Sequence, residues 1–327
     1  MAEQMPDWRP TATLEALQQR AALLARLRRY FAEQGVLEVE TPLLSAAGIP
    51  DPHIPSFTTT PGPDGTAARY LNTSPEFAMK RLLAAGSGAI YQVCKAFRRG
   101  ELGSRHNPEF TLLEWYRPGF DHLRLMDEVD VLVRELADGL RPLGSTERFS
   151  YRECFERHLQ IDPLTADVSA LKACAQAQGV KVSGMVDADR DDWCDLLLSH
   201  CIQPHLGKDR LTFIYDYPAS QAALARIRPE DPPVAERFEL FIDGIELANG
   251  FHELQDAHEQ RARFETDLAR RQAEKLELIP LDERLLEALK AGLPACAGVA
   301  LGLDRLLLVL TGRGNLREIL AFSYERS

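Results

Sequence analysis

The fold prediction begins with AIYQVCKAFRRGELGSRHNPEFTLLEWYR, residues 89–117. β-Branched and aromatic residues dominate its two ends, 89–97 and 109–117, and this composition is typical of β-strands. Residues 98–108, between them, are charged and contain glycine, so we expect a loop. This loop is longer than a minimal hairpin needs, and long loops of this kind tend to be functional.

Groups of helices and strands are expected on both sides of this unit. Before it, apolar residues at three- and four-residue steps predict a helix that Thr13 caps and Gly35 ends. Further strands are expected at 36–39, 211–215, 235–242, 244–249 and 297–301, and further helices at 75–85, 256–276, 282–291 and 303–310. The expected strands are joined by hairpin-like links, and the expected helices follow one another in groups. This order predicts an α+β fold with a mainly antiparallel β-sheet flanked by helices.

We expect residues 1–327 to form a single domain, because no Pro/Ser-rich linker divides the chain. Residues from about 120 to 205 are mostly helical in pattern and are interpreted as an insertion. This insertion carries no functional signal.

Composition excludes several classes of protein. The 38 Lys and Arg against 49 Asp and Glu give a net charge of −11, which does not favour nonspecific binding to nucleic acid or to a membrane surface. The apolar runs are far shorter than the roughly 20 residues of a membrane span. The first ten residues show no basic segment followed by an apolar one, so we expect no secretory signal and a cytoplasmic location.

The six cysteines are scattered without a C-x-x-C pair, which favours reduced and mostly buried thiols. One stretch, with Cys194, His200, Cys201 and His205, raises the possibility of a metal site. The helical spacing of its thiols and leucines favours core packing instead.

Three signatures of other chemistries are missing from the sequence. It contains no G-x-x-x-x-G-K-[ST] phosphate loop, no strand followed by G-x-G-x-x-G, and no G-x-S-x-G elbow. P-loop nucleotide binding, Rossmann cofactors and covalent serine catalysis are therefore not indicated.

The loop FRRGELGSRHNPEF, residues 97–110, is the first of three clusters that could carry chemistry. Arg98, Arg99, Arg105 and His106 concentrate cationic and donor groups there. Guanidinium forks match phosphate and carboxylate oxygens, so the loop could bind a polyphosphate. The alternative is a solvated basic turn.

The second cluster is FELFIDGIELANGFHEL, residues 238–254. A hairpin bent at Asp243-Gly244 would bring Glu239 and Glu246 onto neighbouring strands. Two buried carboxylates repel unless a cation lies between them, and Mg²⁺ would relieve that repulsion. The alternative places both on the wet face of an edge hairpin.

The third cluster is GVALGLDRLLLVLTG, residues 298–312, in which Asp304 and Arg305 begin an apolar helix. An arginine in such surroundings is costly to bury unless it meets an anion. Pairing with Asp304 is the alternative.

Together, and in this order, the clusters resemble the motifs of class II aminoacyl-tRNA synthetases, and specifically the lysine-specific subgroup. GVLEVETP (35–42) resembles the dimer-forming first motif, FRRGELGSRHNPEF with LLEWY the second, and GVALGLDR the third. LNTSPEFAMKRL and ELANGFHEL resemble the segments of the lysine pocket. The resemblance extends from about residue 15 to the C-terminus.

Only about a dozen residues precede the first helix, whereas a lysyl-tRNA synthetase carries an anticodon-binding barrel there. In this respect the chain is similar to the elongation factor P–(R)-β-lysine ligase family. The resemblance implies ATP-dependent formation of a (R)-β-lysyl adenylate, with lysine used more weakly, and transfer to a lysine of elongation factor P. It also implies Mg²⁺ and a homodimer, and it makes tRNA an improbable partner and a membrane an unexpected one.

The resemblance also implies a role for individual residues. Arg98 and Arg305 would be the catalytic residues, holding the α- and γ-phosphates, and Glu239 and Glu246 would hold Mg²⁺. The ATP site would comprise Arg98, Arg99, Gly100, Glu101, Arg105, His106, Asn107, Phe110, Glu246, Leu247, Gly302 and Arg305. The amino-acid pocket would comprise Ser74, Pro75, Glu76, Glu114, Tyr116, Asn249, Glu253 and Ala300.

The sequence departs from the synthetase pattern at three positions. Ser74 and Ala300 stand where lysyl-tRNA synthetases commonly have alanine and glycine, and we expect them to reshape the pocket for a shifted amino group. Gly100 takes the place of the glutamate of F-R-x-E, so Glu101 or backbone groups would replace its contact to adenine.

Two other functions are compatible with these residues. A lysine-activating enzyme could use a different acceptor, either tRNA or a small molecule. A catalytically silent paralogue could serve as a regulatory subunit, although the retained arginines and glutamates argue against it.

Overall fold

The computed structural model describes residues 8–61, 67–181, 185 and 188–327. The chain divides into two compact units. The first unit comprises Met1–Tyr116, Gln255–Pro294 and Ala300–Ser327, and the second comprises Arg117–Leu254 and Ala295–Val299. Strand β11 (Cys296–Gly302) contributes residues to both.

In the first unit, an antiparallel strand pair carries the arginine-rich loop. Strand β4 (Ile90–Phe97) pairs with β5 (Glu109–Pro118), with Phe97 opposite Glu109. Strand β1 (Leu37–Glu38) runs parallel to β4, and β2 (Leu44–Ser45) pairs with β3 (Tyr70–Leu71) in a separate small sheet. The strand–loop–strand prediction for residues 89–117 is thereby confirmed.

Helix α1 (Leu14–Glu33) supplies much of the apolar core of this unit. Thr13 caps it as predicted, accepting a hydrogen bond from the backbone N–H of Ala16. The fully buried ring of Phe31 stacks on Tyr91, with centroids 4.3 Å apart. Burial of such a side chain stabilises the fold by roughly 1.5–3 kcal/mol.

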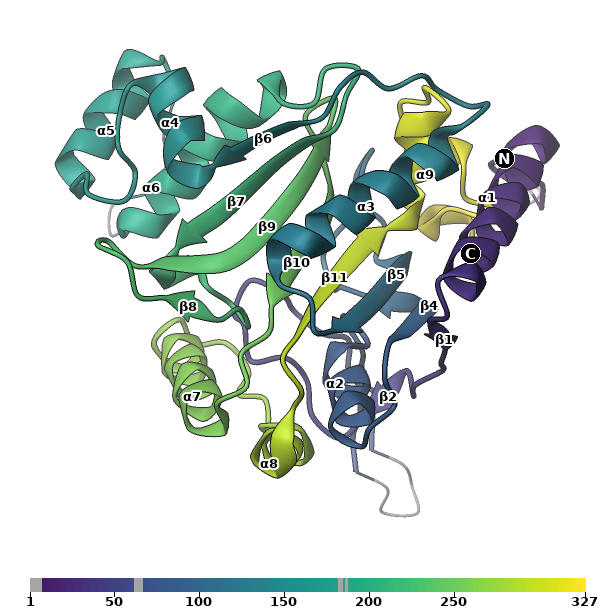
Figure 1. Cartoon of the computed structure of the whole chain (residues 1–327), viewed down its shortest axis with the longest axis horizontal. Coiled ribbons are helices and arrows are strands. Elements are labelled where there is room, and N and C mark those ends of the chain that lie inside the picture. Colours follow the sequence, from purple (N-terminus) through teal and green to yellow (C-terminus); the bar gives the residue numbers. More distant parts are fainter. Residues whose placement is uncertain (1–7, 62–66, 182–184, 186–187) are drawn as a thin grey trace, which may run out of the picture. The chain divides into compact units, whose positions relative to one another are not determined.

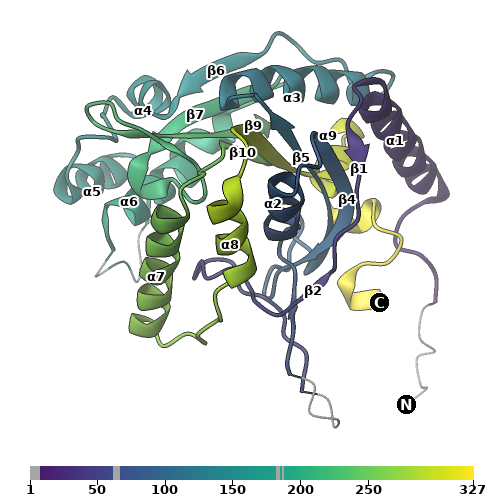
Figure 2. The ribbon, with the colours of Figure 1, turned by 60° about the horizontal axis from the view of Figure 1, so that its bottom comes forward.

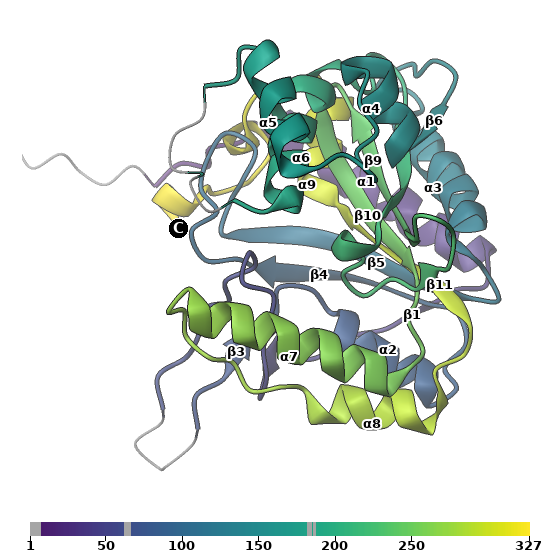
Figure 3. The same cartoon turned by 90° about the vertical axis from the view of Figure 1, so that its left-hand side faces the viewer.

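The other helices of the first unit are α2 (Glu76–Ala84), α7 (Ala257–Ala273), α8 (Glu283–Gly292) and α9 (Leu303–Leu310). Helices α2 and α8 lie side by side (Figure 2), and α8 also packs along α7 (Figure 3). Short 3₁₀ turns at Leu316–Glu318 and Tyr324–Arg326 complete this unit.

The second unit contains a mostly antiparallel group of strands. Strand β9 (Val234–Ile242) pairs antiparallel with β10 (Ile245–His252), β7 (Thr212–Pro218) and β8 (Ile227–Arg228), while β6 (Glu147–Ser150) runs parallel to β7. Asp243 and Gly244 both have positive φ, 51° and 70°, in the two-residue turn between β9 and β10. Asp-Gly favours such a turn, and the predicted hairpin is confirmed.

Helices cover this group of strands on one side and at one end. Helix α3 (His122–Ala137) lies against β9 and β10 (Figure 1). Helices α4 (Tyr151–Leu159), α5 (Val168–Ala177) and α6 (Arg190–Leu197) gather around a core that includes Tyr151, Phe155 and Trp193. A π-helical turn (Leu198–Ile202) and 3₁₀ turns (Gln203–His205, Ala219–Gln221) follow.

These elements confirm the predicted α+β class, with mostly antiparallel strands flanked by helices. The 120–205 region is mostly helical, as predicted, although β6 interrupts it. The single-domain interpretation of residues 1–327 stays a prediction. None of the described helices combines the length and apolarity needed to cross a bilayer.

Candidate functional site

The predicted phosphate-binding loop begins at Arg98, immediately after β4. The Arg98 guanidinium lies 5.1 Å from the Phe110 ring centroid, and one of its nitrogens lies 3.6 Å from a Glu101 carboxylate oxygen. Its buried Nε has no hydrogen-bond partner among the described residues. A half-buried guanidinium with such a donor suits an anionic ligand, because an unmade hydrogen bond at a buried donor costs about 1–3 kcal/mol.

Gly100 is needed in this loop for its backbone conformation. Its φ is +85°, a region that residues with a Cβ rarely adopt. Gly100, at the glutamate position of F-R-x-E, therefore allows a tight turn here. Glu101, the next residue, lies beside Arg98.

Arg305, on the first turn of α9, binds the same loop. Its Nε donates to the backbone carbonyl of Arg105 at 3.2 Å, and Nη2 donates to His106 Nε2 at 2.7 Å. The Asp304 carboxylate is held instead by Arg20 (2.6 Å) and by the Thr111 backbone N–H (2.7 Å). Arg305 thus points toward the loop that Arg98 begins, and Gly302 is the N-cap residue of its helix.

Asn107 connects this loop to the C-terminal segment. Its buried side chain donates to the carbonyl of Glu109 at 2.6 Å and accepts from the N–H of Tyr324 at 3.2 Å. His106 and Asn107 also line a cavity of about 280 Å³ with residues 315–317 and 323–325. Asn107 therefore shapes the loop. Arg99 is anchored by a hydrogen bond from its backbone N–H to the carbonyl of Pro55. The contacts of Asn107 and Arg99 with ATP stay predictions.

Ser74, Glu114 and Tyr116 form one hydrogen-bonded array in the first unit. Glu114 is 2% exposed, and each of its carboxylate oxygens accepts a hydrogen bond: Oε2 from Ser74 at 2.7 Å and Oε1 from Tyr116 at 2.8 Å. A fixed, buried carboxylate of this kind is suited to bind an ammonium group. The structure therefore brings together three of the predicted pocket residues.

Glu76 is adjacent to this array and already contacts a cation. Its backbone N–H donates to Ser74 Oγ at 3.1 Å, and its Oε1 accepts from Lys80 Nζ at 2.6 Å. Ser74, Pro75 and Glu76 line a cavity of about 160 Å³. Lys80, 2% exposed, is a residue that the sequence reasoning missed, although its position four residues after Glu76 on a helix is the spacing at which such pairs form.

The predicted magnesium ligand Glu239 lies in the second unit. Its carboxylate is 8% exposed and accepts from Tyr217 at 2.7 Å and from Arg237 at 2.5 Å. Burial, and then the negative charge of Glu246, raise the pKa of Glu239. The alternative that placed Glu239 on the solvent-exposed face of an edge hairpin is therefore wrong. The Glu239 and Glu246 carboxylates repel each other, and carboxylate oxygens are ligands that Mg²⁺ prefers, so the pair is suited to bind this ion.

The register of β9 and β10 places the neighbouring predicted residues. Asn249 lies opposite Glu239 and accepts from Arg237 at 3.2 Å, and the register shifts around Leu247, between Glu246 and Ala248. Glu253 is 1% exposed and is fixed by its backbone N–H to Cys296. Arg237 and Tyr217 were not predicted, since their involvement depends on the strand register.

The predicted site residues thus fall into two groups. Glu239, Glu246, Leu247, Asn249 and Glu253 belong to the second unit, and the remainder, Ala300 included, belong to the first. Their roles toward ATP, Mg²⁺ and the amino acid stay predictions.

The Cys194–His205 stretch packs as predicted. Cys194 and Cys201 join the apolar core of the second unit, and no metal-binding group forms there among the residues that the structure describes.

Comparison with known proteins defines the class first. Residues 1–326 match the family model for class II tRNA synthetases of the aspartate, lysine and asparagine type. The chain therefore belongs to the class II tRNA synthetase family.

Relatives narrow the assignment further. Proteins from Enterobacter sp. (strain 638), Klebsiella pneumoniae and Salmonella dublin, each named elongation factor P–(R)-β-lysine ligase, are 50% identical over 323 residues. The alignments cover 98% of this chain and 98% of each relative. The chain belongs to this family of ligases.

Proposed function

We propose that the protein activates (R)-β-lysine with ATP, and lysine more weakly, and transfers it to a lysine side chain of elongation factor P. The reaction would release pyrophosphate and then AMP. The full-length similarity to ligases with that name supports the proposal. The observation in this chain that carries it is the buried Glu114, held by Ser74 and Tyr116, at the position the motifs assign to the far ammonium.

The chemistry of each group of residues follows from its charge. Arg98 and Arg305 would neutralise charge that develops on the phosphates as the carboxylate attacks, and this kind of stabilisation is often the largest catalytic contribution. Glu239 and Glu246 would hold Mg²⁺, which would neutralise phosphate charge when bound. Glu114 and Glu76 would orient the two amines of the substrate.

We also propose a homodimer formed through the first-motif segment. Leu37, Leu43 and Leu44 are exposed by 56%, 38% and 49%, and exposed apolar groups of this kind favour a protein interface. A cytoplasmic location follows from the proposed acceptor, because elongation factor P acts in translation.

Intact-mass measurement of elongation factor P tests the function. Incubation with this protein, ATP, Mg²⁺ and (R)-β-lysine should add the mass of one lysyl residue, and reactions without ATP should add none. ATP–pyrophosphate exchange without any mass gain on elongation factor P would refute the acceptor while leaving the activation step intact. A tRNA-dependent release of AMP would favour the tRNA-charging alternative.

A further inference from the structure

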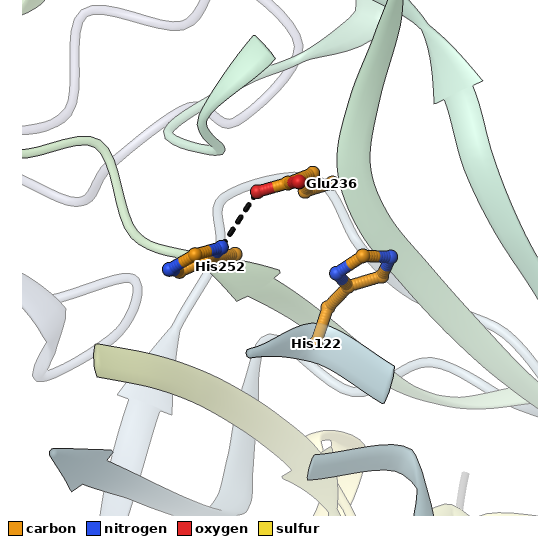
Figure 4. A group of neighbouring side chains, drawn as sticks. All are labelled: His122, Glu236 and His252. Carbon is orange, nitrogen blue, oxygen red and sulfur yellow. Dashed lines mark hydrogen bonds and ion pairs between the residues drawn. The ribbon is translucent and has the colours of Figure 1, made fainter. Parts of the chain in front are cut away.

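His122, Glu236 and His252 form a cluster in the second unit that the proposed reaction does not use. Each offers one ligand atom, and these atoms all lie within 4.8 Å of one another. Figure 4 shows the three side chains turned toward a common space, with the hydrogen bond between His252 and Glu236. In that bond His252 Nδ1 lies 2.6 Å from Glu236 Oε2.

The cluster lies on the opposite face of the β9–β10 pair from the predicted magnesium ligand. In the register of β9 and β10, Phe251 lies opposite Arg237 and Asn249 lies opposite Glu239, so His252 follows opposite Glu236. Side chains alternate between the two faces along a strand. Glu236 and His252 therefore lie on the face opposite to that of Glu239. Helix α3 packs against β9 and β10, and His122 is its first residue.

The second observation concerns the hydrogen bonds of the His122 ring. Its side chain is 2% exposed, and its Nε2 lies 3.3 Å from Asp216 Oδ1. A carboxylate can only accept, so Nε2 is the donor in this contact, and in the neutral imidazole Nδ1 keeps its lone pair. That buried Nδ1 has no hydrogen-bond partner among the described residues, and the ring faces Glu236 and His252 (Figure 4).

The arrangement reproduces a recurrent feature of metal sites. A metal-binding histidine usually donates its other ring N–H to a carboxylate, which fixes its tautomer and orientation, as Asp216 does for His122 here. The backbones of the other two side chains are also fixed: Arg226 donates its N–H to His252 O (2.8 Å), and its carbonyl accepts from the N–H of Glu236 (2.9 Å).

We propose that His122, Glu236 and His252 bind a divalent transition metal of the zinc class, which fastens the start of α3 to β9 and β10. Two imidazoles and one carboxylate are a ligand set that zinc uses in proteins. Ligand atoms in a tetrahedral zinc site lie about 3.3 Å apart, so shifts on the order of 1 Å would close the cluster around the ion. The metal would replace the hydrogen bond between His252 and Glu236.

The charges around the cluster are compatible with a divalent cation. Glu236 and Asp216 are negatively charged, and Asp216 is also paired with Arg228 at 2.5 Å. The nearest cations, Arg226 and Arg228, approach the Glu236 carboxylate no closer than 3.9 and 3.7 Å, which is beyond hydrogen-bonding distance. The Glu236 oxygens therefore keep lone pairs for a metal.

Metal titration of the full-length protein tests the proposal independently of its reaction. After chelator treatment, wild-type protein should bind one equivalent of Zn²⁺ in equilibrium dialysis and give the intense visible absorption of low-coordinate Co²⁺. A tenfold excess of Mg²⁺ should not displace either ion, because Mg²⁺ prefers oxygen ligands. Saturating Zn²⁺ should raise the Tm by about 5 °C.

Matched variants locate the ion. Glu236→Gln keeps the side-chain shape and should weaken Zn²⁺ binding at least 100-fold and abolish the rise in Tm. His200→Asn, at an exposed histidine beside Cys201, should bind as the wild type does. Absence of stoichiometric binding by the wild type, unchanged binding by Glu236→Gln, or an equal loss in His200→Asn would each overturn the proposal. Absence of binding by the wild type would overturn the proposal even if a variant does not fold.

Discussion

The ammonium nitrogen of Lys80 lies 2.6 Å from Oε1 of Glu76, and the Lys80 side chain is almost completely buried. Glu76 is the carboxylate to which the synthetase motifs assign the amino group nearest the reacting end of the substrate. Lys80 therefore holds this carboxylate in place from within α2.

Replacement of Lys80 by methionine should destabilise the protein by about 3 kcal/mol, because it leaves a largely buried carboxylate without its cation. Urea unfolding would measure the loss. Lys290→Met breaks a similar pair, 2.7 Å from Glu287, but on an exposed helix face, and should cost less than about 0.5 kcal/mol. Equal losses in the two variants would contradict the importance of burial.

Tyr116→Phe should raise the KM for (R)-β-lysine about tenfold with a smaller change in kcat. The variant removes the hydroxyl that holds Glu114 Oε1, and the loss of one hydrogen bond to a charged group costs about 1.5–3 kcal/mol. Pyrophosphate exchange at varied amino-acid concentration provides the measurement.

Tyr91→Phe is the matched control for that variant. Tyr91 also donates to a glutamate, Glu38, at 2.8 Å, but outside the predicted pocket. Its KM should match that of the wild type. A parallel rise in both variants would indicate general loosening of the sheet and not a pocket at Glu114.

Arg305→Lys should lower kcat for adenylate formation by about 10²–10³, since a lysine cannot reproduce the two-pronged hydrogen bonding of a guanidinium. Arg313→Lys, which alters an arginine bonded to Gln19 in the same unit, should retain nearly full activity. Full activity in Arg305→Lys would remove Arg305 from the predicted phosphate site.

Ala300→Gly should shift the substrate preference toward lysine, because it removes the methyl group that we expect to reshape the pocket. The ratio of kcat/KM for (R)-β-lysine to that for lysine should fall about tenfold. Ala288→Gly, on α8, is the control and should leave the ratio unchanged. Gly302→Ala is unsuitable as a control because it alters the predicted ATP site. An unchanged ratio in Ala300→Gly would count against the hypothesis.

The features that sequence predicted well are local ones. The Asp243-Gly244 turn and the Thr13 cap depend on the conformational preferences of a few adjacent residues, and both form as expected. The arginine-rich loop likewise follows from the composition of the two strands around it.

Other features depend on contacts between distant residues. Arg20 and Asp304, 284 positions apart, form a 2.6 Å ion pair, whereas the sequence alone offered Arg305 as the neighbour of Asp304. The cluster of His122, Glu236 and His252 requires the packing of α3 on two strands in a particular register. Periodicity within one segment contains no information on such pairings.

Asp267, on α7, should make the stability of the protein depend on pH. Burial, and then the negative charge of Asp51, raise its pKa from 3.8 to about 6. Because the folded pKa exceeds the unfolded one, the stabilising contribution is present at low pH and is lost as the pH rises through about 6. Asp267→Asn should remove this dependence.

The difference in unfolding free energy between Asp267→Asn and the wild type should therefore increase, in favour of the variant, by on the order of 1 kcal/mol between pH 5 and pH 8. This figure is reduced for the partial exposure of the group. Glu265→Gln, at an exposed carboxylate of the same helix, should track the wild type at both pH values. If Asp267→Asn also tracks the wild type, the Asp267 carboxyl titrates normally in the folded protein.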